Sequence, residues 1–492
     1  MNKRSCGILM HLTSLPSPYG IGTMGVEAEK FAAWLKSAGQ SYWQVLPTGP
    51  TGYGDSPYQP FSSFAGNPLL IDLDELCDQG LISRTDCENA DFGADPDIVD
   101  YDKINKTRRE LLHKACAAFT DDVGYTSFNL YQADWLEDYA LFMALKTKYG
   151  GKPWNVWDDE IKFRDPEALK KCREELADEI RYEKFCQYIF FRQWTRFHQT
   201  CNSNGIKIIG DIPIYVSPDS SDVWANPQLF ELDERLNPKR VAGVPPDYFS
   251  KTGQLWGNPL YDWAAMKKDN YSWWVKRIKK AAELYDMLRI DHFRAFDTYW
   301  AIPFGHPTAE TGKWEQGPGM DLFNVIKSEI KNVDIIAEDL GDIFDSVKKL
   351  LSDTGFPGMR VLQFGFNDKN EDNDHLPHNY PKNCVCYTGT HDNATFRQWF
   401  AEADLSTKNM AKRYLEKGLF ANLNMRAIRA AYASPAALAI IPMQDVLNLG
   451  AKARMNVPST LGGNWAWRMK PNALKGKTAE KLRDYAEIYL RL

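Results

Sequence analysis

The sequence predicts an α/β protein built as a (β/α)8 (TIM) barrel with large inserted subdomains. Three observations support this fold. Eight short apolar segments are typical of buried strands, helical patterns lie between many of them, and four of the eight end in a carboxylate. Because (β/α)8 enzymes carry their catalytic groups at the carboxyl ends of the strands, those four carboxylates also predict where the chemistry takes place.

The strand candidates are apolar runs bounded by loop residues. They occupy residues 6–12, 42–46, 206–216, 287–296, 334–340, 358–366, 384–390 and 438–444. After the first, residues 26–38 predict a helix in which Phe31, Trp34 and Leu35 share one face, and Gly39 ends it. Helical patterns also occupy 134–149 and 167–200, and the charged tail over 470–492 predicts a last helix.

The spacing of the strands is uneven. About 155 residues separate the second candidate from the third, and about 70 separate the third from the fourth, too many for structureless loops in a compact protein. We therefore expect one catalytic barrel over residues 1–492, with inserted subdomains at approximately 55–130, 131–203 and 217–286 around the cleft.

Composition excludes several classes of protein. With 59 basic and 65 acidic side chains, the net charge of −6 does not fit a nucleic-acid-binding surface. No apolar run approaches the length of a membrane span, and the stretch before Met10 is too short for the apolar core of a signal peptide. The nine cysteines lack zinc-ribbon spacing, which indicates reduced thiols and a cytoplasmic location. We expect neither nucleic acid nor a membrane as a partner.

Four carboxylates mark the candidate site. Asp211 ends the third strand, Asp291 lies in the fourth, Glu338 in the fifth, and Asp392 follows the seventh. For any one of them, a structural ion pair or a capping role is an equally good explanation. Four carboxylates at the same end of a barrel favour an active site instead.

Two of these carboxylates suit the cleavage of a glycosidic bond. Retaining enzymes use a nucleophile and a general acid/base roughly 5–5.5 Å apart, which adjacent strands could supply as Asp291 and Glu338. Arg289 lies two residues before Asp291 and so faces the same way, where its charge would favour an ionised nucleophile. Glu338 ends an apolar strand, so partial desolvation would keep it protonated as an acid. Asp392 with His391 could hold sugar hydroxyls.

An ordered set of longer motifs surrounds these acids. They are Gly7-Ile8-Leu9 with Thr13-Ser14-Leu15-Pro16, Gly-Tyr-Gly-Asp-Ser-Pro-Tyr-Gln-Pro at 52–60, Gly-Val-Pro-Pro-Asp-Tyr-Phe-Ser at 243–250, Gly-Gln-Leu-Trp-Gly-Asn-Pro at 253–259 and Gly-Gly-Asn-Trp-Ala-Trp-Arg at 462–468. Over essentially the whole chain the sequence resembles the amylomaltase (disproportionating enzyme) family of 4-α-glucanotransferases, glycoside hydrolase family 77, which is related to the α-amylases.

The resemblance implies a role for each acid: Asp291 as nucleophile, Glu338 as general acid/base and Asp392 as stabiliser of the transition state. It implies a barrel without the C-terminal β domain of α-amylases, and no metal or other cofactor. The expected substrates are α-1,4-glucans and maltooligosaccharides, with glucose as an acceptor. It also implies that sugar rings are contacted by Tyr58, Asp211, Gln254, Trp256, Arg289, His391 and Asn464.

The sequence assigns less definite roles to two loops and to His292. The segment 243–259 reads as a Pro- and Gly-rich loop, and its three aromatics, Tyr248, Phe249 and Trp256, suggest a lid over bound glucan. Residues 52–60 could be only a turn-rich connection, and Tyr53 is left without a role. We interpret His292 as a structural histidine.

Two other functions remain open. A hydrolase would share the fold and the acids and differ only in whether water or a sugar hydroxyl takes the glucosyl group; residues alone do not decide this, and the preference for transfer rests on the resemblance. A non-catalytic glucan-binding protein is disfavoured because all three acids are present. No Gly-x-Gly-x-x-Gly motif supports a dinucleotide enzyme.

Overall fold

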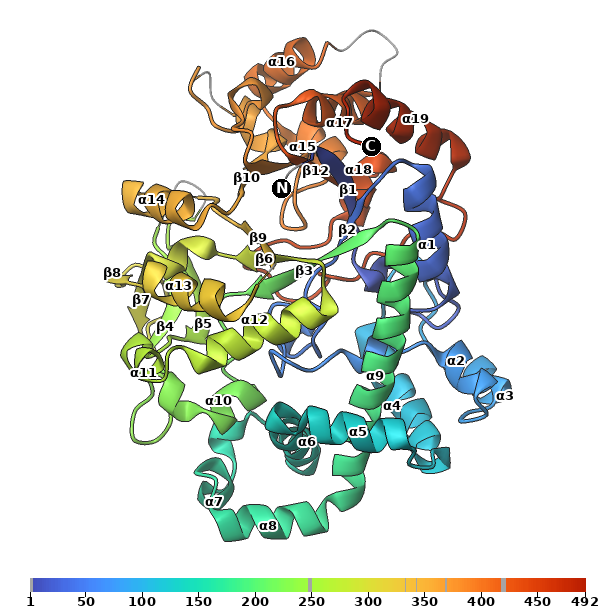
Figure 1. Ribbon diagram of the computed structural model, residues 1–492, viewed down its shortest axis with the longest axis vertical. Helices are drawn as coiled ribbons and strands as arrows, with labels where there is room; N and C mark the ends of the chain where they lie inside the picture. The colour runs from blue at the N-terminus through green and yellow to red at the C-terminus, as the bar shows by residue number, and fades with distance from the viewer. Residues whose placement is uncertain (1–2, 247–249, 332, 342, 368–369, 417–421) are drawn as a thin grey trace.

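Eight parallel strands form the centre of the protein. The computed structural model describes residues 3–246, 250–331, 333–341, 343–367, 370–416 and 422–492. The strands are β1 (Ser5–Leu9), β2 (Tyr42–Gln44), β3 (Lys207–Pro213), β6 (Met287–Asp291), β9 (Asp334–Ala337), β10 (Gly358–Val361), β11 (Cys384–Tyr387) and β12 (Leu438–Pro442). Their order is β10-β11-β12-β1-β2-β3-β6-β9 (Figure 1). Ala337 N donates to Pro357 O at 3.0 Å and so joins the two ends of the sheet. The predicted (β/α)8 barrel and all its strands are confirmed.

The strands are buried on both faces, as parallel barrel strands must be. Every residue of β1 and β12 is buried. Inside the barrel, Tyr387 Oη on β11 donates to Gln44 Oε1 on β2 at 2.9 Å, which satisfies two polar groups in the core. At Gly7 a side chain is excluded, because an added Cβ would lie 2.5 Å from the Tyr42 backbone oxygen.

Several strands end earlier than predicted. The chain leaves β6 at His292, whose φ is 53°, and residues expected to continue the strand form a 3-10 turn, Phe293–Phe296. Glu338 likewise follows β9 instead of lying inside it. The apolar pattern continues past the strand because these turns are themselves buried. Asp291 is the last residue of β6 and Glu338 is the first residue after β9, so the two acids lie at the carboxyl ends of adjacent strands.

Helices surround the barrel. They are α1 (Val26–Ser37), α9 (Ala177–Ser203), α12 (Ser272–Leu284), α13 (Met320–Glu329), α14 (Asp345–Thr354), α17 (Leu423–Ala433) and α19 (Gly476–Ile488), with α15 (Phe396–Glu402), α16 (Leu405–Tyr414) and α18 (Met443–Val446) in the last quarter of the chain. The predicted helix 26–38 and the predicted last helix are both present. No strand follows β12 in the part of the chain that the structure describes.

A group of helices fills the long gap between β2 and β3. It contains α2 (Leu73–Asp78), α3 (Arg84–Glu88), α4 (Tyr101–Ala118), α5 (Val123–Tyr131), α6 (Ala133–Lys148), α7 (Asp159–Lys162), α8 (Pro166–Glu175) and most of α9. In Figure 1 helices α4 to α8 lie at the opposite end of the molecule from α16 and α19. The helical patterns at 134–149 and 167–200 correspond to α6 and to α8 with α9. Helix α9 runs from this group to β3 and packs against α4, α5 and α6.

A buried carboxyl lies inside this helical group. Glu183 on α9 is only 2% exposed, and Arg109 Nη1 on α4 lies 3.6 Å from its Oε1. Burial raises the pKa of Glu183 to about 8, because the opposing charge of Arg109 offsets only part of the cost of desolvation.

A second, antiparallel sheet was not anticipated. It consists of β4 (Arg240–Val244), β5 (Gln254–Pro259), β7 (Thr298–Pro303) and β8 (Lys313–Gln316) in the order β5-β4-β7-β8, with α10 (Ser221–Ala225) and α11 (Trp263–Lys268) nearby in the chain. The prediction of a loop over 243–259 is wrong at both ends, which are β4 and β5. A register shift between Val241 and Gly243, and the positive φ of Gly257, hide the alternation typical of strands. Tyr248 and Phe249 lie outside the described residues.

The two ends of the chain meet beside β1. Arg491, which follows α19, is fully buried and donates to five backbone carbonyls, among them Ser5 O on β1 and Tyr432 O on α17.

Candidate active site

The predicted site residues gather at the carboxyl end of the barrel. Seven of the ten line one open cleft of about 1210 Å³: Tyr58, Gln254, Trp256, Asp291, His391, Asp392 and Asn464. The other three, Asp211, Arg289 and Glu338, are each less than a tenth exposed. Each bonds to a residue that lines the cleft: Asp211 to Tyr58, Arg289 to Asp291, and Glu338 to the backbone of His292.

Arg289 joins two of the acids. Its Nη1 donates to both oxygens of Asp211 at 2.7 Å, and its Nη2 lies 2.8 Å from Asp291 Oδ1. Asp211 and Arg289 are direct partners in the β3–β6 pairing, and Arg289 and Asp291 share a face because they are two apart on β6. The predicted ion pair is therefore present. Burial nevertheless raises the pKa of Asp291, with Arg289 opposing the shift.

Glu338 lies one strand further along the barrel. Its Oε2 accepts from the backbone N–H of His292 and its Oε1 from that of Leu340, both at 2.7 Å. Burial and the nearby charge of Asp291 raise the pKa of Glu338 to about 7, against the effect of Arg289 and of the two backbone donors. A carboxyl with that pKa can both give and take a proton near neutral pH.

Asp392 is held as an anion. Burial alone would raise the pKa of its carboxyl, but His391, Asn456 and Arg289 together lower it well below the usual range. His391 Nε2 lies 3.3 Å from Asp392 Oδ2, and Asn456 Nδ2 donates to Asp392 Oδ1 at 2.7 Å. Burial opposes protonation of His391, but the Asp392 carboxylate outweighs it and raises the pKa of the imidazole.

An aromatic wall stands beside these acids. The Tyr58 ring stacks on His391 with centroids 5.0 Å apart and planes inclined by 15°, and Trp465 lies 5.7 Å from Tyr58. Tyr58 Oη donates to Asp211 Oδ2 at 2.8 Å, so the ring is fixed at both its face and its tip. Such apolar faces with polar tips suit the binding of pyranose rings.

Another part of the cleft lining comes from the second sheet. Trp256 on β5 packs edge-on against His292 with centroids 4.7 Å apart, and its Nε1 donates to Gln254 Oε1 at 3.1 Å. His292 lines the cleft beside Asp291, and burial lowers the pKa of its imidazole to about 3, so the ring is neutral. His292 therefore packs against Trp256, as a structural histidine would, and also forms part of the cleft surface.

Asn464 and Asn456 lie on a loop that forms another side of the cleft. Asn464 Oδ1 accepts from Val457 N at 3.0 Å and its Nδ2 donates to Thr460, so its amide braces the loop itself. Asn456, which contacts Asp392, was not predicted from the sequence. Its only local signal is an amide inside the segment Arg-Met-Asn-Val-Pro at 454–458, which has no fixed spacing to the acids.

Among the described residues, no group of three or more His, Cys, Asp or Glu side chains is arranged to hold a metal ion.

The chain is similar to known proteins over almost its whole length. A family model described as 4-alpha-glucanotransferase matches residues 10–475. A 4-alpha-glucanotransferase of Clostridium butyricum is 49% identical over 486 residues, 98% of this chain and 100% of that protein. One of Thermus thermophilus is 46% identical and covers 99% of each chain.

Solved structures give the same result. An amylomaltase from Streptococcus agalactiae in complex with acarbose superposes with a TM-score of 0.97 at 43% identity and covers 99% of this chain and 100% of that one. An amylomaltase from Corynebacterium glutamicum shares the fold with a TM-score of 0.79 at 16% identity, over 99% of this chain and 75% of that one. The chain therefore belongs to the 4-alpha-glucanotransferase family, glycoside hydrolase family 77.

Proposed function

We propose that Asp291 is the nucleophile and Glu338 the general acid/base of a retaining glucan transfer, with Asp392 stabilising the transition state. The observation that carries this assignment is the contrast between two neighbouring carboxyls. Burial raises the pKa of both carboxyls, but Asp291 is ion-paired with Arg289 at 2.8 Å, which opposes the shift, whereas the charge of Asp291 adds to the shift of Glu338, whose pKa is about 7. Two carboxyls in environments this different are suited to opposite protonation states, which the first step of the reaction requires.

The reaction takes two steps. Glu338 donates its proton to the glycosidic oxygen while an Asp291 oxygen attacks the anomeric carbon, so the donor bond breaks and a glucosyl ester forms. The shortened glucan leaves with the proton. The 4-hydroxyl of an acceptor sugar then attacks the same carbon, Glu338 takes the hydroxyl proton, and Asp291 is released as a carboxylate. Two inversions retain the α configuration.

The remaining polar groups bind and orient the donor sugar in this proposal. Asp392 accepts hydrogen bonds from sugar hydroxyls and His391 donates to them, and the negative charge of Asp392 favours the oxocarbenium-like transition state. Tyr58 covers one sugar face. Asp211 and Arg289 act mainly by holding Tyr58 and Asp291, since both are buried beneath the cleft surface.

We assign the acceptor side of the cleft to Gln254 and Trp256, with Asn464 bracing the loop that carries it. The inserted subdomains at 55–130, 131–203 and 217–286 serve as cleft walls; this is supported by Tyr58, Lys146 and Trp256, which come from the three ranges and all line the cleft. The substrates are α-1,4-glucans, and glucose serves as an acceptor.

A cytoplasmic location is supported by the thiols. All nine cysteines lie in the described part of the chain and none forms a disulfide. Within those same residues, no helix combines the length and the apolar character needed to cross a bilayer.

Maltotriose disproportionation tests the assignment. The enzyme should convert maltotriose to glucose and a ladder of longer maltooligosaccharides without net gain of reducing ends, and Asp291→Asn and Glu338→Gln should both abolish the ladder. Retained transfer in either variant would contradict the assigned roles. A steady rise in reducing ends without longer chains would contradict transfer as the main outcome and leave the two acids in place.

A further inference from the structure

A segment after the last barrel strand reaches Asp392 by two separate hydrogen bonds. Asn456 Nδ2 donates to the carboxylate Oδ1 at 2.7 Å, and Arg454 Nη2 donates to the backbone oxygen of Asp392 at 2.8 Å. Arg454 Nε also donates to the backbone oxygen of Asn456 at 2.7 Å. One guanidinium thus connects the backbone that carries the amide to the backbone that carries the carboxylate.

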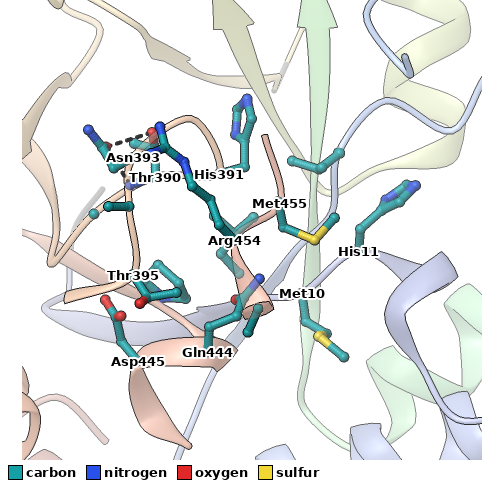
Figure 2. Close-up of a pocket in the computed structure, with 16 residues that line it drawn as sticks. Met10, His11, Thr390, His391, Asn393, Thr395, Gln444, Asp445, Arg454 and Met455 are labelled. Atoms are coloured by element: carbon teal, nitrogen blue, oxygen red, sulfur yellow. Dashed lines mark hydrogen bonds between the residues drawn. The ribbon is translucent and has the colours of Figure 1, made fainter. Parts of the chain in front are cut away.

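The turn that bears Asp392 needs such support. It is closed internally by Asn393, whose Oδ1 accepts from Thr390 N and Oγ1 at 2.8 and 2.9 Å. Figure 2 shows Arg454 extending from beside Met455 toward this turn, along a small cavity of about 20 Å³. A cavity of that size holds about one water molecule. Because the turn borders this space, packing alone does not fix it on that side.

The supporting segment is itself anchored to the cleft wall. Trp465 N donates to Met455 O at 2.6 Å, and Val457 N donates to Asn464 Oδ1 at 3.0 Å. The segment is therefore tied to the loop whose Trp465 ring also contacts His391.

We propose that Arg454 and Asn456 form a bracket that positions Asp392 for glucan transfer: Asn456 fixes the rotation of the carboxylate, and Arg454 fixes the turn beneath it. The proposal rests on the function proposed above for Asp392. The Asp392 side chain is 44% exposed in an open cleft, so few contacts other than Asn456 and His391 restrain its rotation. A carboxylate held in place before the substrate binds stabilises a developing charge without reorganisation.

The charged and titratable groups that face Asp392 separate this role from mere packing. They come from its own turn, from β6 and from the loop at Tyr58, and are His391, Arg289, Asp291 and Tyr58. Asn456 is the neutral donor among the contacts of the carboxylate. Its removal leaves every one of these charges in place and takes away only a bond to the ionised form, so the pKa of Asp392 should rise.

Steady-state kinetics on maltotriose test the bracket. Asn456→Ala should lower kcat about tenfold with little change in KM, the size expected for losing one hydrogen bond to a charged group. The acid limb of the kcat–pH profile should stay where it is, because the nucleophile Asp291, whose pKa is raised by burial, sets that limb and the pKa of Asp392 lies well below it. Arg454→Met should lower kcat similarly, and Arg454→Lys should recover part of the loss. Arg397→Met is the matched control, because Arg397 donates to a backbone carbonyl, Asn448 O, at 3.2 Å on an exposed surface and should leave kcat unchanged.

Asp392→Asn separates the two proposals. If that variant keeps full transfer activity, the role of Asp392 itself is wrong. If it is inactive while Asn456→Ala has the kcat of the unaltered enzyme, the bracket is refuted. Should Arg454→Met fail to fold, Asn456→Ala and Asn456→Asp still test the bracket. Asn456→Asp places a second carboxylate against Asp392, so its kcat should be lower than that of Asn456→Ala. An equal or higher kcat of Asn456→Asp would contradict the proposal.

Discussion

The buried Glu183 predicts a pH-dependent stability that a single substitution removes. The carboxyl has a pKa of about 8 in the folded protein and an ordinary value of 4.5 when exposed. Between these values the folded state holds a proton that the unfolded state has lost, so the contribution of Glu183 to stability is largest below about pH 4.5 and falls as pH rises toward 8. At 1.36 kcal/mol for each pH unit between the two pKa values, the loss is about 5 kcal/mol.

Glu183→Gln keeps the shape of the protonated side chain and has no carboxyl that can ionise. The free energy of unfolding of this variant should match that of the parent near pH 5 and exceed it by up to about 5 kcal/mol at pH 8. Urea denaturation followed by circular dichroism at both pH values measures the difference. Glu137→Gln is the control, because Glu137 is an exposed partner of Lys184 on the same helical group and should change stability by less than about 1 kcal/mol at either pH. Equal stability of parent and Glu183→Gln at pH 8 would refute the reasoning.

Three further predictions concern the site and the chain ends. Tyr58→Phe removes the hydroxyl that donates to Asp211 at 2.8 Å and should lower kcat/KM for maltotriose about tenfold without loss of fold; an unchanged value contradicts the role of that bond. Because Glu338 must be protonated to act as the acid and its pKa is about 7, kcat/KM should fall as pH rises above 7, and a profile that stays flat there excludes this assignment. Arg491→Ala should lower the free energy of unfolding by about 3 kcal/mol, since five backbone carbonyls lose a charged donor, and a denaturation midpoint equal to that of the parent disproves it.

The barrel was predictable from the sequence because its signals are local. Each strand is a short apolar run, and burial on both faces makes that run continuous. Asp291 and Glu338 could be placed at the barrel end because each follows such a run directly. Their strands ended early for a physical reason: His292 takes a positive φ, and the buried turn after it continues the apolar pattern.

The second sheet and the contacts of Asp392 were not predictable in the same way. In β5 the positive φ of Gly257 and the register shift against β4 break the alternation that identifies a strand. Asn456 reaches Asp392 across 64 positions of sequence, and the hydrogen bond exists only because β11 and β12 bring the two loops together. A hydrogen bond of that kind depends on the completed barrel, and neither segment has a periodic sequence pattern that would predict it.

The pairing of β1 with β12 has a consequence for how the protein is made. The register begins at Ser5 with Leu438 and ends at Leu9 with Pro442, so the first strand finds this neighbour roughly 430 residues later in the chain. A ribosome adds about 5–20 residues per second, so β1 waits roughly 20–90 s with one edge unpaired. An open edge of that kind can pair with another chain. Nascent or C-terminally shortened chains should therefore depend on chaperones far more than the finished enzyme does.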